Sequence, residues 1–91
     1  MKNKFLPNDV VKFTEFVNGK KTDTFPNLIE FCKTNYNYDL DVYKYYVIDS
    51  YEKTGQVWVK GLEELNTFHE SWFELISRTP AAQVLFGGKN G

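Results

Sequence analysis

The sequence predicts a small, mainly β domain of the α+β type, with about five short strands, one inserted short helix and a short C-terminal helical turn. The chain has 91 residues, so we expect a single domain over residues 1–91. Phe, Tyr and Trp make up 18% of it, and such large side chains can form a core without a metal or disulfides. Runs of β-branched and aromatic residues alternate with turn residues such as Asn18-Gly19.

The first hairpin is predicted around Asn18-Gly19. Residues 10–17 are rich in β-branched and aromatic residues and stop at this pair. Asn-Gly suits a type I′ turn because both central residues of that turn adopt positive φ. Residues 20–25 are expected to return as the second strand.

A short helix is predicted over residues 26–35. Pro26 suits a first helical turn because its missing N–H group would have no partner there. The apolar residues expected on the core-facing side are Phe25, Leu28, Ile29 and Cys32. Residues 36–41 form a polar loop that is rich in Asn and Tyr.

A second hairpin is predicted from residues 42–51 and 56–60, two runs separated by a turn sequence. A four-residue loop would pair Ile48 with Val59, whereas a bulge in the turn would pair Asp49 with Val59. A slip of one residue exchanges the two faces of a strand, so both registers stay open. Within the return strand, Val57 and Val59 should share one face, while Trp58, Gln56 and Lys60 share the other.

The last third of the chain permits two interpretations. Apolar spacing over residues 62–76 is compatible with one continuous helix. Several middling helix formers in this stretch favour a turn or short helical piece over 62–66 and a strand over 71–76 instead. In that strand, Phe73 and Leu75 would point inward and Trp72 outward beside Glu74. Residues 79–91 are expected to form a C-terminal tail with helical turns over 81–86.

Three segments together resemble small SH3-like β-barrel proteins of bacteriophages and prophages: "LPNDVVKF", "YYVIDSYEKTGQVWVKGL" and "FHESWFELI". The resemblance implies an SH3-like barrel that serves as an adaptor or inhibitor of a larger host protein, for example an anti-defence or anti-CRISPR inhibitor. It departs from a plain barrel at residues 20–41, which are longer than a barrel loop. This segment is either an insertion that carries the specific function or the mark of a different α+β fold.

Candidate catalytic and metal-binding residues are few. A Cys nucleophile needs a neighbouring base, but no sequence context links the single Cys32 to the single His69. Metal sites need several ligands at defined spacing, which the available residues lack: Asp39, Asp41, Glu63, Glu64, His69 and Glu70. We therefore predict a protein that is not an enzyme, with no catalytic residue, metal or cofactor.

Composition also restricts the partner and the compartment. With one arginine and a net charge of −1, duplex DNA is a poor fit as a partner. No run approaches the ~20 apolar residues of a membrane-spanning helix, so we expect no membrane partner. One cysteine cannot form an intramolecular disulfide, which fits a reducing compartment; we expect the cytoplasm, that of the host cell if the protein is phage-encoded.

Aromatic and acidic residues indicate a protein-binding surface, because Trp and Tyr are favoured at interface hot spots. The predicted aromatic contacts are Trp58, Trp72, Tyr36, Tyr38 and Tyr43, with Tyr45 and Tyr46 as extensions. Glu63, Glu64, Glu70 and Glu74 would attract a basic protein partner.

Two other functions remain open from the sequence. A small barrel with aromatic residues and Lys12, Lys20 and Lys21 would suit single-stranded nucleic acid, although the charge balance opposes it. The other alternative is a homo-oligomeric sponge that holds a small ligand, such as a nucleotide, between subunits. The absence of clustered arginine gives this alternative little support.

Overall fold

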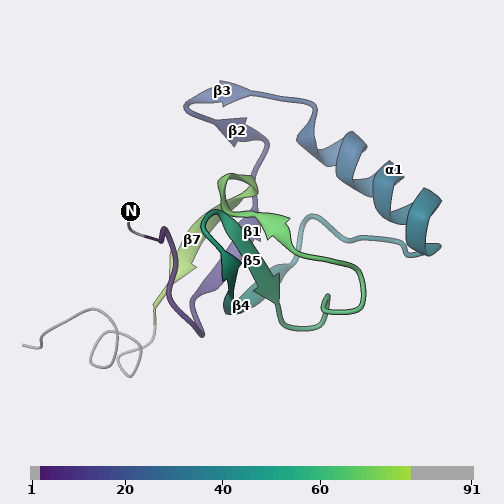
Figure 1. Cartoon of the computed structure of the whole chain (residues 1–91). Coiled ribbons are helices and arrows are strands. Elements are labelled where there is room, and N and C mark those ends of the chain that lie inside the picture. The colour runs from purple at the N-terminus through teal and green to yellow at the C-terminus, as the bar shows by residue number, and fades with distance from the viewer. Residues whose placement is uncertain (1–2, 79–91) are drawn as a thin grey trace, which may run out of the picture.

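The computed structural model describes residues 3–78 of the chain (Figure 1). Its elements are β1 (Val10–Phe13), β2 (Phe16–Val17), β3 (Lys20–Lys21), α1 (Thr24–Tyr36), β4 (Tyr45–Lys53), β5 (Gln56–Val59), β6 (Phe68–His69), the 3₁₀ turn η1 (Glu70–Trp72) and β7 (Phe73–Ser77). The predicted tail over 79–91, with its helical turns at 81–86, lies outside the described residues. None of the helices described is long and apolar enough to span a bilayer.

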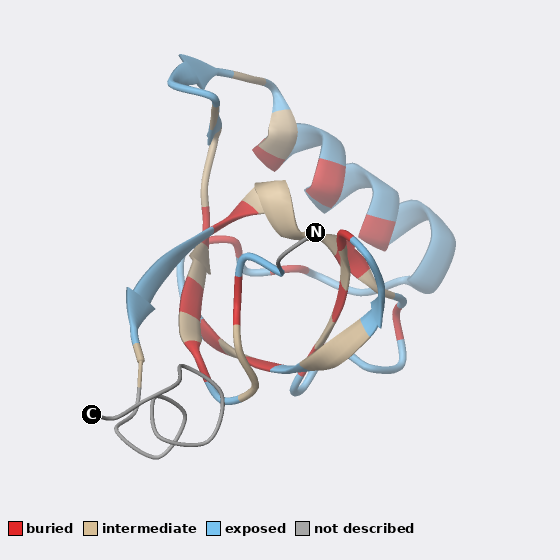
Figure 2. Cartoon of the chain, turned by 60° about the vertical axis from the view of Figure 1, so that its left-hand side comes forward, coloured by how far each residue is buried: buried red, intermediate tan, exposed pale blue. Residues whose placement is uncertain are grey.

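The strands form a five-stranded antiparallel sheet in the order β6-β5-β4-β1-β7, and β2 and β3 form a separate hairpin. The sheet is strongly curled, with buried residues on its inner side (Figure 2). This confirms the mainly β prediction. It does not confirm an SH3-like barrel, because β6 and β7 are the edges of the sheet and no strand pairing joins them within residues 3–78.

Aromatic side chains fill the inside of the curl. Phe13 on β1 lies 4.4 Å from Phe73 on β7, 5.6 Å from Phe68 on β6 and 5.5 Å from Tyr46 on β4, measured between ring centroids. Phe73 also meets Phe5 edge-on at 6.4 Å. The Phe13 ring on the inner strand β1 therefore contacts both edge strands of the sheet, and this packing holds the sheet curled.

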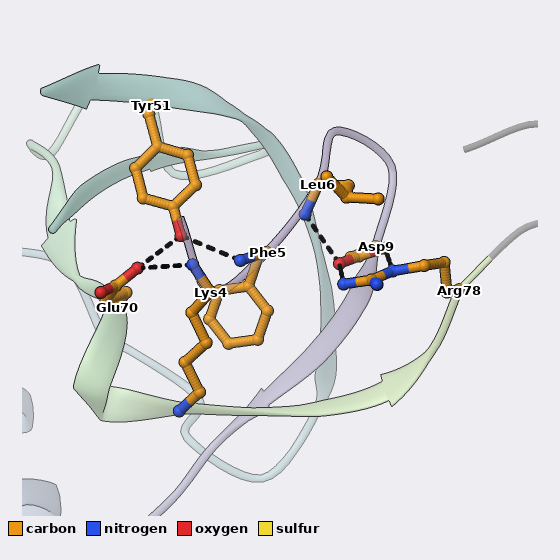
Figure 3. Close-up of polar contacts among 7 residues, drawn as sticks. All are labelled: Lys4, Phe5, Leu6, Asp9, Tyr51, Glu70 and Arg78. Atoms are coloured by element: carbon orange, nitrogen blue, oxygen red, sulfur yellow. Dashed lines mark hydrogen bonds and ion pairs between the residues drawn. The ribbon is translucent and has the colours of Figure 1, made fainter. Parts of the chain in front are cut away.

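The N-terminal segment fills the space between the two edges (Figure 3). The Lys4 ammonium donates to the Phe73 carbonyl at 2.8 Å, and the Lys4 N–H donates to the Glu70 carboxylate at 3.1 Å. The Tyr51 hydroxyl accepts the Phe5 N–H at 3.0 Å and donates to Glu70. Polar groups that would otherwise be left without partners are thus satisfied at the rim.

A buried ion pair ties the start of β1 to the end of β7. Asp9 is fully buried, and its carboxylate accepts from Arg78 Nε at 2.9 Å and from a terminal guanidinium nitrogen at 2.7 Å. The same carboxylate accepts the Leu6 N–H at 2.8 Å (Figure 3). The hydrogen bond to Asp9 raises the pKa of Arg78. A buried carboxylate requires such charged and hydrogen-bonding partners.

The Asn18-Gly19 hairpin is confirmed, with φ of 54° and 81° at the two turn residues. It is shorter than expected. Residues 10–17 form two strands, because the chain leaves the sheet after β1, where the Thr14 N–H donates to the Trp72 carbonyl at 2.9 Å. The return strand stops at Lys21 because α1 already begins at Thr24.

The predicted helix exists and is longer than residues 26–35. It ends at Tyr36 and is capped by Asn37, which adopts the left-handed conformation with φ of 53° and donates its N–H to the Lys33 carbonyl. Phe25, Leu28 and Cys32 are buried as predicted. Ile29 was expected in the core but is 39% exposed, because one residue past Leu28 is about 100° around the helix.

The hairpin of β4 and β5 combines features of both expected registers. Lys53 pairs with Gln56 around a tight turn, and two register shifts along the strands bring Ile48 opposite Val59. Bulges of this kind let one strand carry more than one register. The predicted faces of β5 are confirmed: Val57 and Val59 are buried and Trp58 lies on the other side.

The continuous helix over 62–76 is wrong, and the strand predicted at 71–76 begins two residues later, at Phe73. Phe73 is buried as predicted, but Leu75, which was expected to point inward, is 44% exposed. Leu75 pairs with Val11, and since β7 is the last strand of the described sheet, a neighbouring strand covers Leu75 from one side alone.

We expect Asp9→Ala to lower the free energy of unfolding by about 2–4 kcal/mol, because it leaves the Arg78 guanidinium and the Leu6 N–H without their shared acceptor. Urea unfolding of wild type and variant measures this. The control is Asp39→Ala, which removes the exposed ion pair to Lys33 and should cost less than about 1 kcal/mol. Equal losses in the two variants would contradict the role of Asp9.

Two tyrosines should make the protein less stable in alkali. Burial, together with the coulombic effect of Tyr38, raises the pKa of Tyr46 to about 12, and burial with the hydrogen bond to Glu70 raises the pKa of Tyr51 to about 12. Both pKa values exceed the ordinary tyrosine value of about 10. Their contribution to stability is therefore complete below pH ~10 and is lost as the pH rises through ~12. Urea unfolding at a series of pH values should show this decline, and Tyr51→Phe should make it shallower; an unchanged slope would oppose this account.

Candidate functional site: an apolar groove beside helix α1

A groove of about 360 Å³ lies between helix α1 and the chain that leads from residue 65 through β6 to η1. The helix contributes Thr24, Asn27, Leu28, Phe31, Cys32 and Tyr36; the other wall consists of Leu65, Asn66, Thr67, Phe68 and Trp72. The volume is within the usual range for ligand pockets, near its lower end.

Helix periodicity builds the first wall. Leu28 and Cys32 are one turn apart and buried, so they anchor α1 to the core. Phe31, beside them on the helix, is 48% exposed, and its ring meets that of Tyr36 edge-on at 6.1 Å. Phe31 therefore presents an aromatic surface to the groove without belonging to the core.

The second wall rests on the aromatic core. Trp72 is half-buried and meets the Phe68 ring at 6.2 Å. The turn η1 sets its position: His69 Nδ1 accepts the Ser71 N–H at 3.1 Å, and the Trp72 carbonyl accepts the Thr14 N–H at 2.9 Å. Thr67 is held by a hydrogen bond to Gln56 at 3.2 Å. This wall is thus fixed by hydrogen bonds before anything binds.

The residues that line the groove carry no formal charge at neutral pH. The polar groups of its lining residues are all neutral: hydroxyls, amides, a thiol and an indole N–H, from Thr24, Thr67, Tyr36, Asn27, Asn66, Cys32 and Trp72. Anionic groups such as phosphates are bound by Arg, Lys or clustered backbone N–H groups. The arrangement therefore suits a neutral, mainly apolar group.

Cys32 and His69 have different and unrelated roles in the structure. Cys32 lines the groove, and burial raises the pKa of its thiol, which favours the unreactive protonated form. His69 caps η1 and makes a second contact with the Ser71 hydroxyl at 2.7 Å. Between residues 3 and 78, no three His, Cys, Asp or Glu side chains gather as a metal site would require.

The structure divides the predicted aromatic surface. Tyr36 and Trp72 line the groove, whereas Tyr38 and Tyr43 are exposed on the connection after α1. Trp58 lies on the outer side of the sheet, where its indole N–H donates to Glu52 at 2.9 Å. The two tryptophans therefore belong to different surfaces.

Two aromatic predictions need correction. Trp72 does not point outward beside Glu74, because it lies in η1 and packs on the core instead of extending β7. Tyr46, expected to extend the exposed patch, is buried and donates its hydroxyl to the Asp41 carbonyl at 2.6 Å. Tyr45 is exposed, as that prediction requires.

The acidic residues are also unequal. Glu70 is engaged by Lys4 and Tyr51 at the rim of the sheet, so its carboxylate stabilises the fold. Glu63 accepts the Gly61 N–H at 2.9 Å. Glu64 and Glu74 are exposed, and their carboxylates form no hydrogen bond or ion pair with other residues of the described chain.

Sequence reasoning missed Phe31, Leu65 and Phe68 as parts of the site. For the helix wall a signal existed, since Thr24, Leu28 and Phe31 are spaced by four and three residues and so lie near one face. For Leu65 and Phe68 no sequence signal was available, because their position opposite α1 depends on how the chain folds back.

Comparisons with known proteins add no relative: no family model, no curated protein and no solved structure matches this chain.

Cys32 should react slowly with a thiol-alkylating reagent at neutral pH, at least about tenfold more slowly in the folded protein than in urea, because it is buried and its thiol pKa is raised. Mass spectrometry over a time course measures the rate. Equal rates in both conditions would show that the wall of the groove opens readily.

Proposed function

We propose that this chain is a protein-binding module that works without catalysis and holds an apolar side chain of its partner in the groove beside α1. The observation that carries the proposal is a concave, uncharged groove with partly exposed aromatic rings of Phe31, Tyr36 and Trp72 on its walls. Hot spots of protein interfaces are typically such pockets, which receive an aromatic or aliphatic anchor.

The arrangement of the walls supports recognition. Trp72 is positioned by backbone hydrogen bonds and by Phe68, so little ordering is needed when a partner binds. Burial of one large apolar side chain contributes roughly 1.5–3 kcal/mol. The groove alone would therefore give weak binding, and a stable complex needs contacts on the surrounding surface.

More specifically, we propose that the chain is an inhibitor or adaptor of a larger host protein, in the manner of the small phage proteins that the sequence resembles. The curled sheet would serve as an SH3-like scaffold, and residues 20–41 would supply the specific site. In support, α1 lies within residues 20–41 and forms one whole wall of the groove. In this proposal the protein acts in the cytoplasm of the host cell.

A random peptide library displayed on yeast tests the binding mode, because such a selection does not require the partner to be identified. We expect selection on the folded protein to enrich peptides with one large apolar anchor. Asn27→Trp, which fills the groove from its exposed wall, should abolish their binding, and Phe31→Ala should weaken it about tenfold.

Ile29→Ala is the matched control, since Ile29 is an exposed apolar residue of the same helix outside the groove; it should change affinity less than about twofold. Peptides that bind wild type and Asn27→Trp equally well would refute the groove as the site. Tight, salt-sensitive binding of a single-stranded oligonucleotide would favour the nucleic-acid alternative instead.

A further inference from the structure

The β2–β3 hairpin is an exposed basic and aromatic projection. It stands away from the curled sheet in both overall views (Figures 1 and 2). Phe16 pairs with Lys21 and Val17 with Lys20, and none of these four residues is buried. Phe16 is 57% exposed. The hairpin therefore adds nothing to the core, although its sequence specifies a well-defined turn.

The base of the hairpin is held firmly. The Thr22 N–H and hydroxyl both donate to the Glu15 carbonyl at 2.8 Å. The Phe16 N–H donates to the Thr14 hydroxyl at 3.1 Å. A two-stranded hairpin is marginal when isolated, so these bonds at its base preserve its shape.

The hairpin adjoins the groove. β2 packs against η1, the turn that carries Trp72, and the Thr14 N–H bonds to the Trp72 carbonyl. Thr24, which lines the groove, follows Lys21 by three residues, so their Cα atoms are at most about 11 Å apart. One partner can therefore contact both the groove and the hairpin.

No ion pair neutralises the two lysines of the hairpin within residues 3–78, although the acidic residues Glu15 and Asp23 flank it. The side chains of Lys20 and Lys21 form no hydrogen bond or ion pair with other residues between 3 and 78. Asp23 lies at the N-terminus of α1, where the positive end of the helix dipole attracts it. Asp9, the other aspartate of the N-terminal third, is also occupied elsewhere, because it forms an ion pair with Arg78.

From these observations we propose that the β2–β3 hairpin is the second half of the binding surface and that it recognises acidic residues beside the partner's apolar anchor. Lys20 and Lys21 supply the charge complementarity, and Phe16 packs on the adjoining partner chain. This inference rests on the proposed function, since it names which protein segment the groove accepts: an apolar anchor with an acidic flank. This partner is acidic where the sequence predicted a basic one, a prediction that relied on four glutamates. Two of these, Glu63 and Glu70, are hydrogen-bonded within the fold.

The flank preference is measured with a second displayed library, in which one large apolar residue is fixed and the positions on both sides are random. We expect selection at low salt to enrich Asp and Glu on one side of the anchor. The best peptide, synthesised with its acidic residues and with each replaced by the neutral amide, should bind at least about threefold more tightly in the acidic form. High salt should remove that difference.

Variants assign the preference to the hairpin. The double variant Lys20→Glu, Lys21→Glu should reverse the preference for acidic flanking residues. Phe16→Ala should weaken the binding of the acidic peptide about threefold or more. Lys53→Glu is the control, because Lys53 is an exposed lysine on another hairpin, that of β4 and β5, and should leave the preference unchanged. Circular dichroism of each variant verifies that it is folded.

The outcomes separate the two proposals. Groove-dependent peptides with neutral or basic flanks would overturn the hairpin's role and leave the proposed function standing. The hairpin's role would also be overturned if peptides with acidic flanks kept their higher affinity for the double variant Lys20→Glu, Lys21→Glu. The absence of any peptide whose binding depends on Phe31 and Asn27 would overturn the proposed function, and this inference with it. Binding of a single-stranded oligonucleotide through Lys20 and Lys21 would replace the acidic protein segment with a different ligand class.

Discussion

The packing of Phe13 against Phe68 and Phe73 is the interaction on which the rest of the structure depends. Phe13 lies on β1, while the other two rings come from β6 and β7, the opposite edges of the sheet. A flat five-stranded sheet would keep these edges far apart, because neighbouring strands are about 4.8 Å apart. Burial of the three rings together draws the edges toward each other and imposes the curl that Figure 2 shows.

The polar interactions of the fold complete this closure and do not create it. Strand pairing does not join β6 to β7 in the described chain, so the rim between them needs other partners. Lys4 and Tyr51 satisfy Glu70 and the Phe73 carbonyl there. Just past the end of β7, the Asp9 carboxylate holds the Arg78 guanidinium. These bonds matter because each polar group that is buried without a partner costs about 1–3 kcal/mol.

The same curl creates the candidate site. Between Phe68 and Phe73 the chain passes from one edge of the sheet to the other, and η1, which carries Trp72, makes this connection. Helix α1 is anchored by Phe25, Leu28 and Cys32, and the space between this helix and Trp72 is the groove. The β2–β3 hairpin, which directly precedes α1 and contacts η1, lies next to this groove. An apolar site of modest energy and a charged element beside it form a natural pair, since apolar burial provides affinity and charge provides selectivity.

Local chemistry alone determined several features of this protein. The type I′ turn at Asn18-Gly19, the helix near residues 26–35, and the division of Val57 and Val59 from Trp58 follow from backbone preferences and from period-two alternation. The tertiary structure decided the roles of Trp72, Leu75, Tyr46 and Glu70, each of which departs from a pattern read along one strand or segment. Their surroundings come from residues distant in the chain: Phe68 and α1 around Trp72, a single neighbouring strand beside Leu75, and Lys4 and Tyr51 around Glu70. Such surroundings are fixed only when the sheet curls, because burial depends on which segments meet in space and not on the order of residues within one of them.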